Sequence, residues 1–174
     1  MESKLKKCWL EATFAPANGP EKRSTALQRL IARYKWFSAM ALFFTFAFPF
    51  MTLGAFINSG VTGTRLYSFF AFVAAYFLLC SAMDRWLARA LKEIDLATMS
   101  VSEVCSRAFH CRRMHLRFIL ILLPLAFILL GWMAYLVHAE LPIVYGMIAG
   151  GIAGLIIGIL QLRRFLKDYR ALLD

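Results

Sequence analysis

Charged residues are scarce in this sequence. They make up 17% of the 174 residues, against about 25% in soluble domains. Four long runs contain no Asp, Glu, Lys, Arg or His, namely Trp36–Ile57, Leu66–Met83, Phe118–Val137 and Leu141–Leu160. The chain is too short to bury four such runs in a water-soluble core. This pattern therefore excludes an ordinary soluble domain.

The sequence also lacks the common motifs of enzymes and metal sites. It contains no CxxC pair, no phosphate-binding glycine loop, no HExxH and no GxSxG. Cys105, His110, Cys111 and His115 are close in sequence, but Cys105 and Cys111 point apart on a helix, so packing explains them better than zinc. We therefore predict no metal, no cofactor and no catalytic residue.

Ionisable side chains inside a membrane mark proton relays and ion pathways. None is present within the four runs. Their absence weakens the case for a proton-coupled transporter, and the membrane-buried Glu expected of a small multidrug exporter is missing. Nucleic-acid binding is not predicted either, because the aromatic residues lie mostly in the apolar runs and not among the basic residues.

The apolar runs themselves predict the fold class. They are 22, 18, 20 and 20 residues long, and about 20 helical residues cross a hydrocarbon core of roughly 30 Å. We predict an all-α polytopic membrane protein, an antiparallel bundle of four transmembrane helices. The cysteines fall outside the predicted external segments, so a disulfide framework is not expected.

The basic residues predict the orientation of these spans. Of the 20 Lys and Arg residues, only Arg65 lies in a turn on the second side. The others lie before the first run, between the second and third runs, or after the fourth. Positive charge favours the cytosolic side, so both termini and the segment Asp84–Arg117 are expected there. The expected location is the plasma membrane.

Three regions follow from this layout. Residues 1–35 form a basic cytosolic segment, in which Leu5, Cys8, Trp9 and Ala12 predict a short amphipathic helix, and a second helix is expected to start near Thr25. Residues 36–160 form the transmembrane domain, including the cytosolic segment 84–117. Residues 161–174 form a basic cytosolic tail.

The second and third spans are predicted to continue into the cytosol as a helical hairpin. Apolar residues recur at helical spacing through Cys80, Met83, Leu87, Ala90 and Ile94, and again through Val101, Val104, Ala108, Cys111, His115, Phe118 and Leu122. Ser100 and Glu103 have the spacing of a capping box. Two helices with facing apolar stripes and a short link at 95–99 predict an antiparallel pair.

Four arginines lie where this hairpin meets the membrane: Arg107, Arg112, Arg113 and Arg117. They are expected to contact anionic lipid headgroups, which attract basic residues near the membrane surface. An acidic cytosolic protein is the alternative partner.

Four glycines recur every fourth residue in the last run: Gly146, Gly150, Gly154 and Gly158. This spacing places them on one helix face, where small residues allow close helix packing. We predict a packing interface, either with another span of the same chain or with a second subunit.

The stretch IDLATMSVSEVCSRAFHCRRMHLRF, residues 94–118, resembles the middle segment of small, uncharacterised bacterial four-span inner-membrane proteins. Some of these accompany extracytoplasmic-function sigma factors, so the resemblance implies a regulatory role. It implies no residue roles.

Three functions are compatible with these features. The first is a non-enzymatic membrane interaction or regulatory protein, acting through the hairpin or the glycine face on a second copy, a membrane protein or a cytosolic protein. The second is a small transporter or channel for a neutral or lipid-like solute. The third is an enzyme acting on inner-leaflet lipid, which would need Asp84, His110 or His115 gathered in one pocket.

Overall fold

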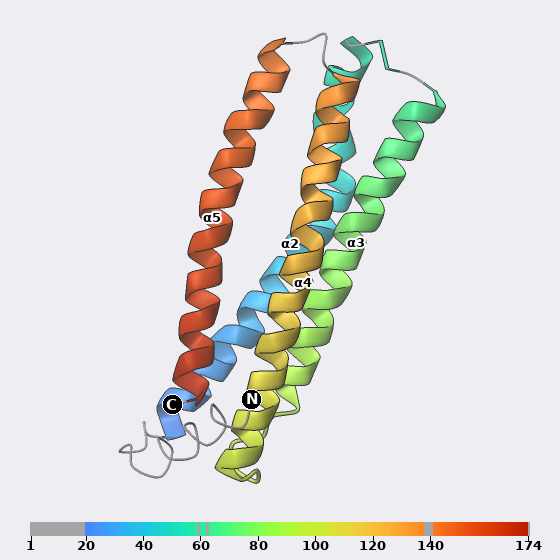
Figure 1. The fold of residues 1–174 in the computed structure, drawn as a ribbon. Helices are drawn as coiled ribbons and strands as arrows, with labels where there is room; N and C mark the ends of the chain where they lie inside the picture. Colours follow the sequence, from blue (N-terminus) through green and yellow to red (C-terminus); the bar gives the residue numbers. More distant parts are fainter. Residues whose placement is uncertain (1–19, 59, 62, 138–140, 174) are drawn as a thin grey trace.

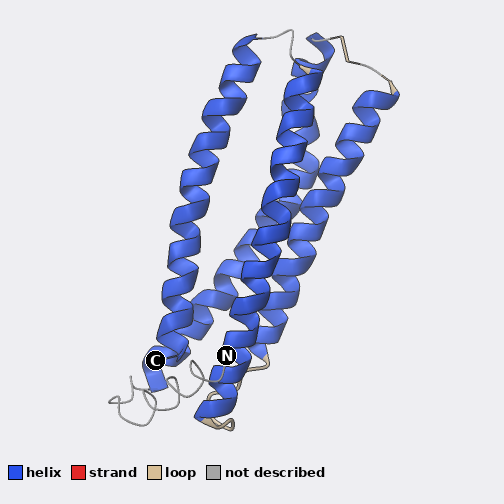
Figure 2. Cartoon of the chain, in the orientation of Figure 1, coloured by secondary structure: helices blue, strands red, loops and turns tan. Residues whose placement is uncertain are grey.

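Four long helices make up almost all of the described chain (Figures 1 and 2). The computed structural model describes residues 20–58, 60–61, 63–137 and 141–173. The helices are α2 (Pro20–Asn58), α3 (Thr64–Lys92), α4 (Val101–Leu136) and α5 (Leu141–Leu173). The described residues contain no strand, which confirms the all-α prediction. The short helix predicted within residues 1–12 lies outside the described residues.

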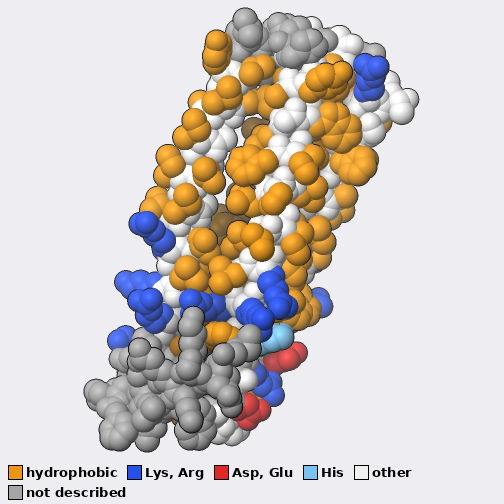
Figure 3. Space-filling view, in the orientation of Figure 1, with side chains coloured by type: hydrophobic (Ala, Val, Ile, Leu, Met, Phe, Trp, Pro, Cys, Tyr) orange, Lys and Arg blue, Asp and Glu red, His pale blue; other side chains and the backbone are white. Residues whose placement is uncertain are grey.

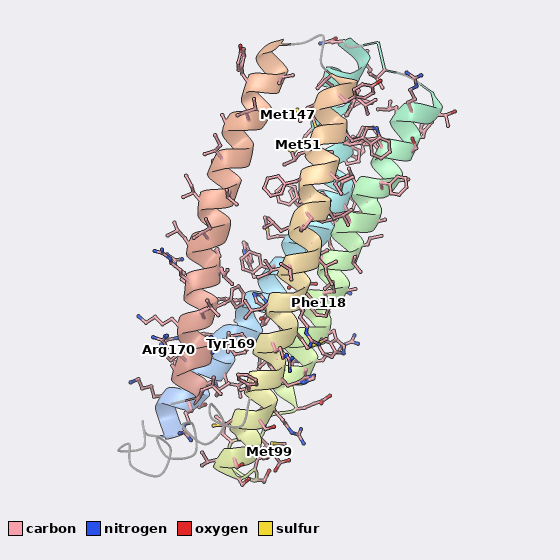
Figure 4. All side chains as sticks on the ribbon, viewed as in Figure 1. Met51, Met99, Phe118, Met147, Tyr169 and Arg170 are labelled. Carbon is pink, nitrogen blue, oxygen red and sulfur yellow. The ribbon has the colours of Figure 1, made fainter. Side chains whose placement is uncertain are left out.

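Successive helices run in opposite directions and pack in a closed order. The pairs α2–α3, α3–α4, α4–α5 and α2–α5 are in contact, and α2 packs most extensively against α3. The start of α2, the end of α5 and the turn between α3 and α4 lie at one end of the bundle (Figure 1). Figure 4 places Met99, Tyr169 and Arg170 toward this end, and Met51 and Met147 toward the other.

All four helices are long and apolar enough to cross a membrane. Most of the large hydrophobic side chains in the middle of the bundle point outward, including Phe50, which is 82% exposed, and Leu120, which is 75% exposed. In water such a surface would be strongly unfavourable. In hydrocarbon it costs nothing, so the outer surface matches a lipid solvent.

Two buried clusters close the ends of the bundle. The first joins all four helices through Leu27, Leu30, Tyr34, Leu87, Ala88, Leu91, Ile94, Val104, Ala108, Cys111, Phe165, Tyr169 and Leu172. The second, at the opposite end, contains Phe56, Leu66, Phe69, Val73, Met133, Leu136 and Val137. The buried hydrophobic residues are therefore concentrated toward the two ends of the bundle, and those of the first cluster lie beyond the apolar runs.

The Lys and Arg side chains gather around the first cluster (Figure 3). We call this part of the molecule the basic end. It contains residues 22–35, 84–117 and 161–173, which carry most of the described Lys and Arg residues. The distribution agrees with the charge pattern of the sequence, whereas which side of a membrane this end faces stays a prediction.

The predicted helical hairpin is present, with one difference at its tip. Leu87, Ile94, Val104 and Ala108 are buried as the spacing predicts. Val101 is 47% exposed, because it is the first residue of α4 and no helix faces it there. Ser100 caps α4 by accepting a hydrogen bond from the Glu103 backbone N–H at 3.3 Å, which confirms this half of the capping box.

The hairpin does not stand alone at the basic end. α2 starts at Pro20 and α5 continues to Leu173, so residues 20–35 and 161–173 are helical extensions of the outer runs. Both extensions pack on the hairpin in the first cluster. The predicted helix start near Thr25 is wrong by five residues, because proline at the first helical position is already set for helix geometry.

Candidate functional site

A pocket opens between the four helices at the border of the basic end. Its volume is about 210 Å³, and its lining residues are Phe37, Asp84, His115, Ile119, Gly158, Gln161, Leu162 and Phe165. We call it the boundary pocket. Phe37, Asp84, Ile119 and Gly158 each lie within three residues of an end of their apolar run. The pocket thus lies where the apolar layer meets the polar one.

Helix α3 brings Asp84 to this site immediately after the last residue of the second run. The contact between α2 and α3 at this level is polar. Ser38 and Ser81 are both buried and their hydroxyls are 2.8 Å apart. Arg85 donates from Nε to the Ser38 hydroxyl at 3.0 Å. These bonds fix the register of α3 against α2, and thereby the position of Asp84.

Helix α4 contributes His115, which is held by a hydrogen-bonded chain of two tyrosines. The Tyr34 hydroxyl lies 2.7 Å from His115 Nδ1 and 3.0 Å from the Tyr169 hydroxyl. Two proton arrangements satisfy this chain: Tyr34 donates to Nδ1, or Nδ1–H donates to Tyr34 and Tyr34 donates to Tyr169. In the second arrangement the other ring nitrogen of His115, Nε2, is an acceptor.

Phe165 of α5 is the centre of an aromatic cluster beside the pocket. Its ring centroid lies 4.9 Å from that of Tyr34, 5.0 Å from that of His115 and 5.7 Å from that of Phe37. Aromatic pairs at such distances add to the energy of plain burial. The cluster joins α2, α4 and α5 around one side chain.

An ion pair closes the basic side of this cluster. Arg33 pairs with the buried carboxylate of Asp168. The Arg33 guanidinium carbon also lies 5.8 Å from the centroid of the Phe165 ring, within the range of a cation–π contact. Arg33 thus already has two partners beside the pocket, Asp168 and Phe165.

Burial shifts the titration of both ionisable lining residues, which lie just outside the apolar runs. Desolvation raises the pKa of Asp84 to about 7, and it lowers the pKa of His115 to about 4. His115 is therefore uncharged at neutral pH, and Asp84 titrates near neutral pH. Burial also raises the pKa of Tyr34 and of Tyr169, so both hydroxyls stay protonated.

The structure brings together two of the three residues considered as acid or base groups. Asp84 and His115 line the boundary pocket. His110 is exposed on α4 and is not among the lining residues. Within the described residues, no group of three or more His, Cys, Asp or Glu side chains is arranged to hold a metal ion.

The predicted glycine face has open space beside it, and Gly158, its last member, lines the boundary pocket. A Cβ atom built on Gly146, Gly150, Gly154 or Gly158 meets nothing within 4 Å. None of the residues in the most apolar 18-residue window of α5 is buried. Packing of these glycines against another described helix of the same chain is therefore not seen, and the interface with a second subunit stays a prediction.

The four predicted arginines divide into two kinds. Arg107 donates to the Glu103 carboxylate at 3.1 Å and to the Glu93 carbonyl at 3.4 Å across the hairpin. Arg113 and Arg117 are exposed and Arg112 is half-buried. Arg107 thus stabilises the hairpin, whereas Arg112, Arg113 and Arg117 remain candidates for headgroup contact.

Sequence reasoning missed the contribution of α5 to this site. Phe165, Tyr169 and Leu172 recur at spacings of four and three residues, which is the pattern of a buried helix face. That signal was present in the segment predicted to be a tail. Gln161 carries no comparable signal, because a single amide at the end of an apolar run has many explanations.

Comparisons of the chain with protein-family models, with curated proteins and with solved structures find no match.

Proposed function

We propose that the chain is a multi-pass protein of a bacterial inner membrane that binds a lipid-like solute in the boundary pocket, as a small carrier or transporter. One observation carries the proposal. Asp84 and His115, from two different helices, line a single pocket at the level where the apolar runs end. A ligand at this level can place its polar group next to Asp84 and His115 and its hydrocarbon chain next to apolar side chains.

The size and lining of the boundary pocket agree with such a ligand. A cavity of about 150 Å³ is large enough for benzene, and this pocket measures about 210 Å³. Phe37, Ile119 and Leu162 provide apolar surface, while Asp84, His115 and Gln161 provide polar groups. Ligand sites in proteins commonly combine a mostly apolar wall with a few placed polar groups.

The charge pattern supports the orientation that belongs to this proposal. The basic end would face the cytosol, as the positive-inside rule predicts. Arg112, Arg113 and Arg117 would then lie at the level of anionic headgroups, each contributing about 1 kcal/mol of attraction. The boundary pocket would open toward the inner leaflet.

Photolabelling tests the binding function. Dodecyl probes with a diazirine on the chain, and with an amine, alcohol or carboxylate head, are incorporated into phosphatidylcholine vesicles holding the protein. At least one probe is expected to label Phe37, Ile119 or Leu162. Gly158→Leu fills the pocket from its wall and should lower this labelling about tenfold, as expected of a direct clash.

Gly54→Leu is the matched control, because Gly54 is an exposed glycine of α2 with open space around an added Cβ, and about 25 Å of helix separates it from Phe37. It should label as the parent does. Labels spread evenly over the outer surfaces of all four helices, or equal labelling of both glycine variants, would contradict the proposed function.

The open glycine face of α5 favours a second candidate function, a membrane interaction protein. Four glycines on one exposed helix face present a smooth surface to another helix. The partner we favour is a second copy of the chain, because one face packing on itself gives a closed two-fold dimer. This function does not require the boundary pocket.

Crosslinking in vesicles separates the two functions. Gly150→Leu should abolish the dimer, because a leucine keeps the two helix backbones apart, whereas Ile152→Leu is a volume-matched control on the same helix. A monomeric parent protein would rule out this second candidate and leave ligand binding unaffected.

A further inference from the structure

The boundary pocket contains three polar groups without a partner among the described residues. The Asp84 carboxylate makes no hydrogen bond or ion pair there, and neither does the Gln161 amide. His115 uses Nδ1 for Tyr34, which leaves Nε2 free. All three side chains are half-buried at the lining of the pocket, so a ligand that binds there can provide their partners.

The three groups together suit a ligand that donates hydrogen bonds better than a ligand that accepts them. A carboxylate only accepts hydrogen bonds, the Gln161 side-chain carbonyl accepts, and neutral His115 accepts at Nε2 when Nδ1–H donates to Tyr34. The Tyr34–Tyr169 bond satisfies that arrangement. A primary ammonium group has three N–H donors, whereas a hydroxyl group has one. The number and type of acceptors therefore fit an ammonium group.

The charge of the lining points the same way. The residues that line the pocket include one acidic residue and no Lys or Arg. The two arginines placed beside the site are engaged elsewhere: Arg85 with Ser38 and Arg33 with Asp168. A phosphate or carboxylate head would meet the negative charge of Asp84. Phe37 and Phe165 add aromatic rings, which attract cations over their faces.

The position of the pocket identifies the rest of the ligand. Ile119 and Gly158 form its wall on the side of the apolar runs. On that side the surface is hollowed between α5 and the neighbouring helices, with hydrophobic side chains at the bottom (Figure 3). A hydrocarbon chain fits this surface, whereas a small water-soluble amine would leave it unused.

Resting on the proposed binding function, we propose that the ligand is an amphiphile with a primary ammonium head, held by Asp84 as its counter-ion and by Gln161 and His115 as further acceptors. The chain of the ligand lies between α4 and α5. Ammonium binding would also offset the desolvation of Asp84, the same burial that raises the pKa of this carboxyl group when the pocket is empty.

The test compares probes that differ only in head or chain. Dodecylamine, dodecanol, dodecanoate and butylamine compete with the photoreactive dodecylamine probe in neutral vesicles holding the full chain. Dodecylamine should compete at concentrations about tenfold lower than the other three, since a charge-assisted contact is the stronger one. Asp84→Asn should remove this advantage, and Gln161→Leu should reduce it.

Glu93→Gln is the matched control for charge, because Glu93 is an exposed carboxylate at the end of α3 and does not line the pocket. It should bind as the parent does. Circular dichroism and gel filtration confirm that each variant is folded. Asp84→Asn is expected to fold because it keeps the shape of the side chain and removes a buried charge.

The outcomes distinguish this inference from the proposed function. If dodecanol or dodecanoate competes as well as dodecylamine at the labelled pocket, the ammonium head is wrong and the binding function stands. If butylamine competes equally well, the hydrocarbon chain contributes nothing and the amphiphile is wrong. If no dodecyl probe labels the pocket in the parent protein, both proposals fail.

Discussion

At the scale of single residues, Tyr34 connects the polar groups of the basic end. Its hydroxyl lies between His115 Nδ1 at 2.7 Å and the Tyr169 hydroxyl at 3.0 Å, and its side chain is fully buried. Because these contacts join α2, α4 and α5, one hydroxyl group sets the position of His115 in the boundary pocket.

Tyr34→Phe should therefore destabilise the protein more than Tyr169→Phe. The first variant leaves both His115 Nδ1 and the Tyr169 hydroxyl without their partner, at a cost of about 1–3 kcal/mol. The second removes one bond and keeps the Tyr34–His115 bond. Thermal unfolding of both variants in the same detergent measures the difference. Equal losses would show that the chain of hydrogen bonds does not act as described.

Asp84 makes the stability depend on pH in a specific direction. Its pKa is raised from 3.8 to about 7 by burial, so the folded protein binds the proton more tightly than the unfolded chain. The favourable contribution of this group is complete below pH 4 and is lost as the pH rises to about 7. Above that pH the carboxylate is charged, and its burial lowers the stability of the folded protein by an amount that no longer changes with pH.

Asp84→Asn should consequently be more stable than the parent at pH 8, by a few degrees in melting temperature at about 2–4 °C per kcal/mol. The difference should shrink steadily as the pH falls from about 7 to about 4. Melting curves of the parent, Asp84→Asn and the control Glu93→Gln over this range provide the measurement. A difference that does not change with pH would contradict the raised pKa.

At the scale of elements, the turn between α3 and α4 depends on side-chain contacts to the backbone. Asp95 accepts from the Ala97 backbone N–H at 2.9 Å and from the Thr98 hydroxyl at 2.8 Å. These bonds lower the pKa of Asp95, the Ala97 bond most of all. Ser100 then caps α4. The sequence between the two helices thus specifies the turn locally.

Ser100→Ala should cost about 1 kcal/mol of stability, the usual value for a lost helix cap. Ser102→Ala is the control, because Ser102 is exposed in the first turn of α4 and caps nothing in the described contacts. Hydrogen exchange at residues 101–104 should rise in the first variant alone. Similar exchange in the two variants would mean that the cap does not stabilise the start of α4.

Helix α5 differs from the other helices in how it is held. Its basic-end half packs through Phe165, Tyr169 and Leu172, while its apolar half, with the four glycines, has no buried residue in its most apolar window. The fully buried contacts of α5 therefore lie in its basic-end half, while at the other end Val144 and Met147 are only partly buried against the second cluster. This leaves its other half available to lipid, ligand or a second helix.

At the scale of the whole molecule, both ends of the bundle have buried cores while the middle exposes apolar side chains. α4 has 36 residues and is about 54 Å long at 1.5 Å per residue, well beyond the hydrocarbon thickness of roughly 30 Å. The excess length forms the basic end. The same end carries the charge that orients a membrane protein.

This arrangement predicts opposite compartments for two reporter positions. A fusion after Asp174 should be active as a cytosolic reporter, and one inserted within residues 138–140 should be active only outside the cytosol. Paired phosphatase and fluorescent-protein fusions measure this directly. Activity of both positions in one compartment would contradict the four-span topology and the orientation of the boundary pocket.

The sequence by itself determined that the described residues contain four long helices, and it predicted the hairpin, because uncharged runs and helical spacing are local signals. Leu87, Val104 and Ala108 were predicted on the buried side and lie there. It also placed the basic residues together. It did not predict that residues 20–35 and 161–173 pack on the hairpin, although the spacing of Phe165 and Tyr169 contained that information.

Only the tertiary structure decided which polar residues meet. Tyr34, His115 and Tyr169 are separated by 81 and 54 residues in the chain, and no spacing rule relates positions on three different helices. Which side chains come into contact depends on how each helix is rotated about its axis. That rotation depends on the sum of many side-chain contacts. The helices could therefore be predicted from local sequence patterns. The pocket could not, because it is formed by the packing of four helices against one another.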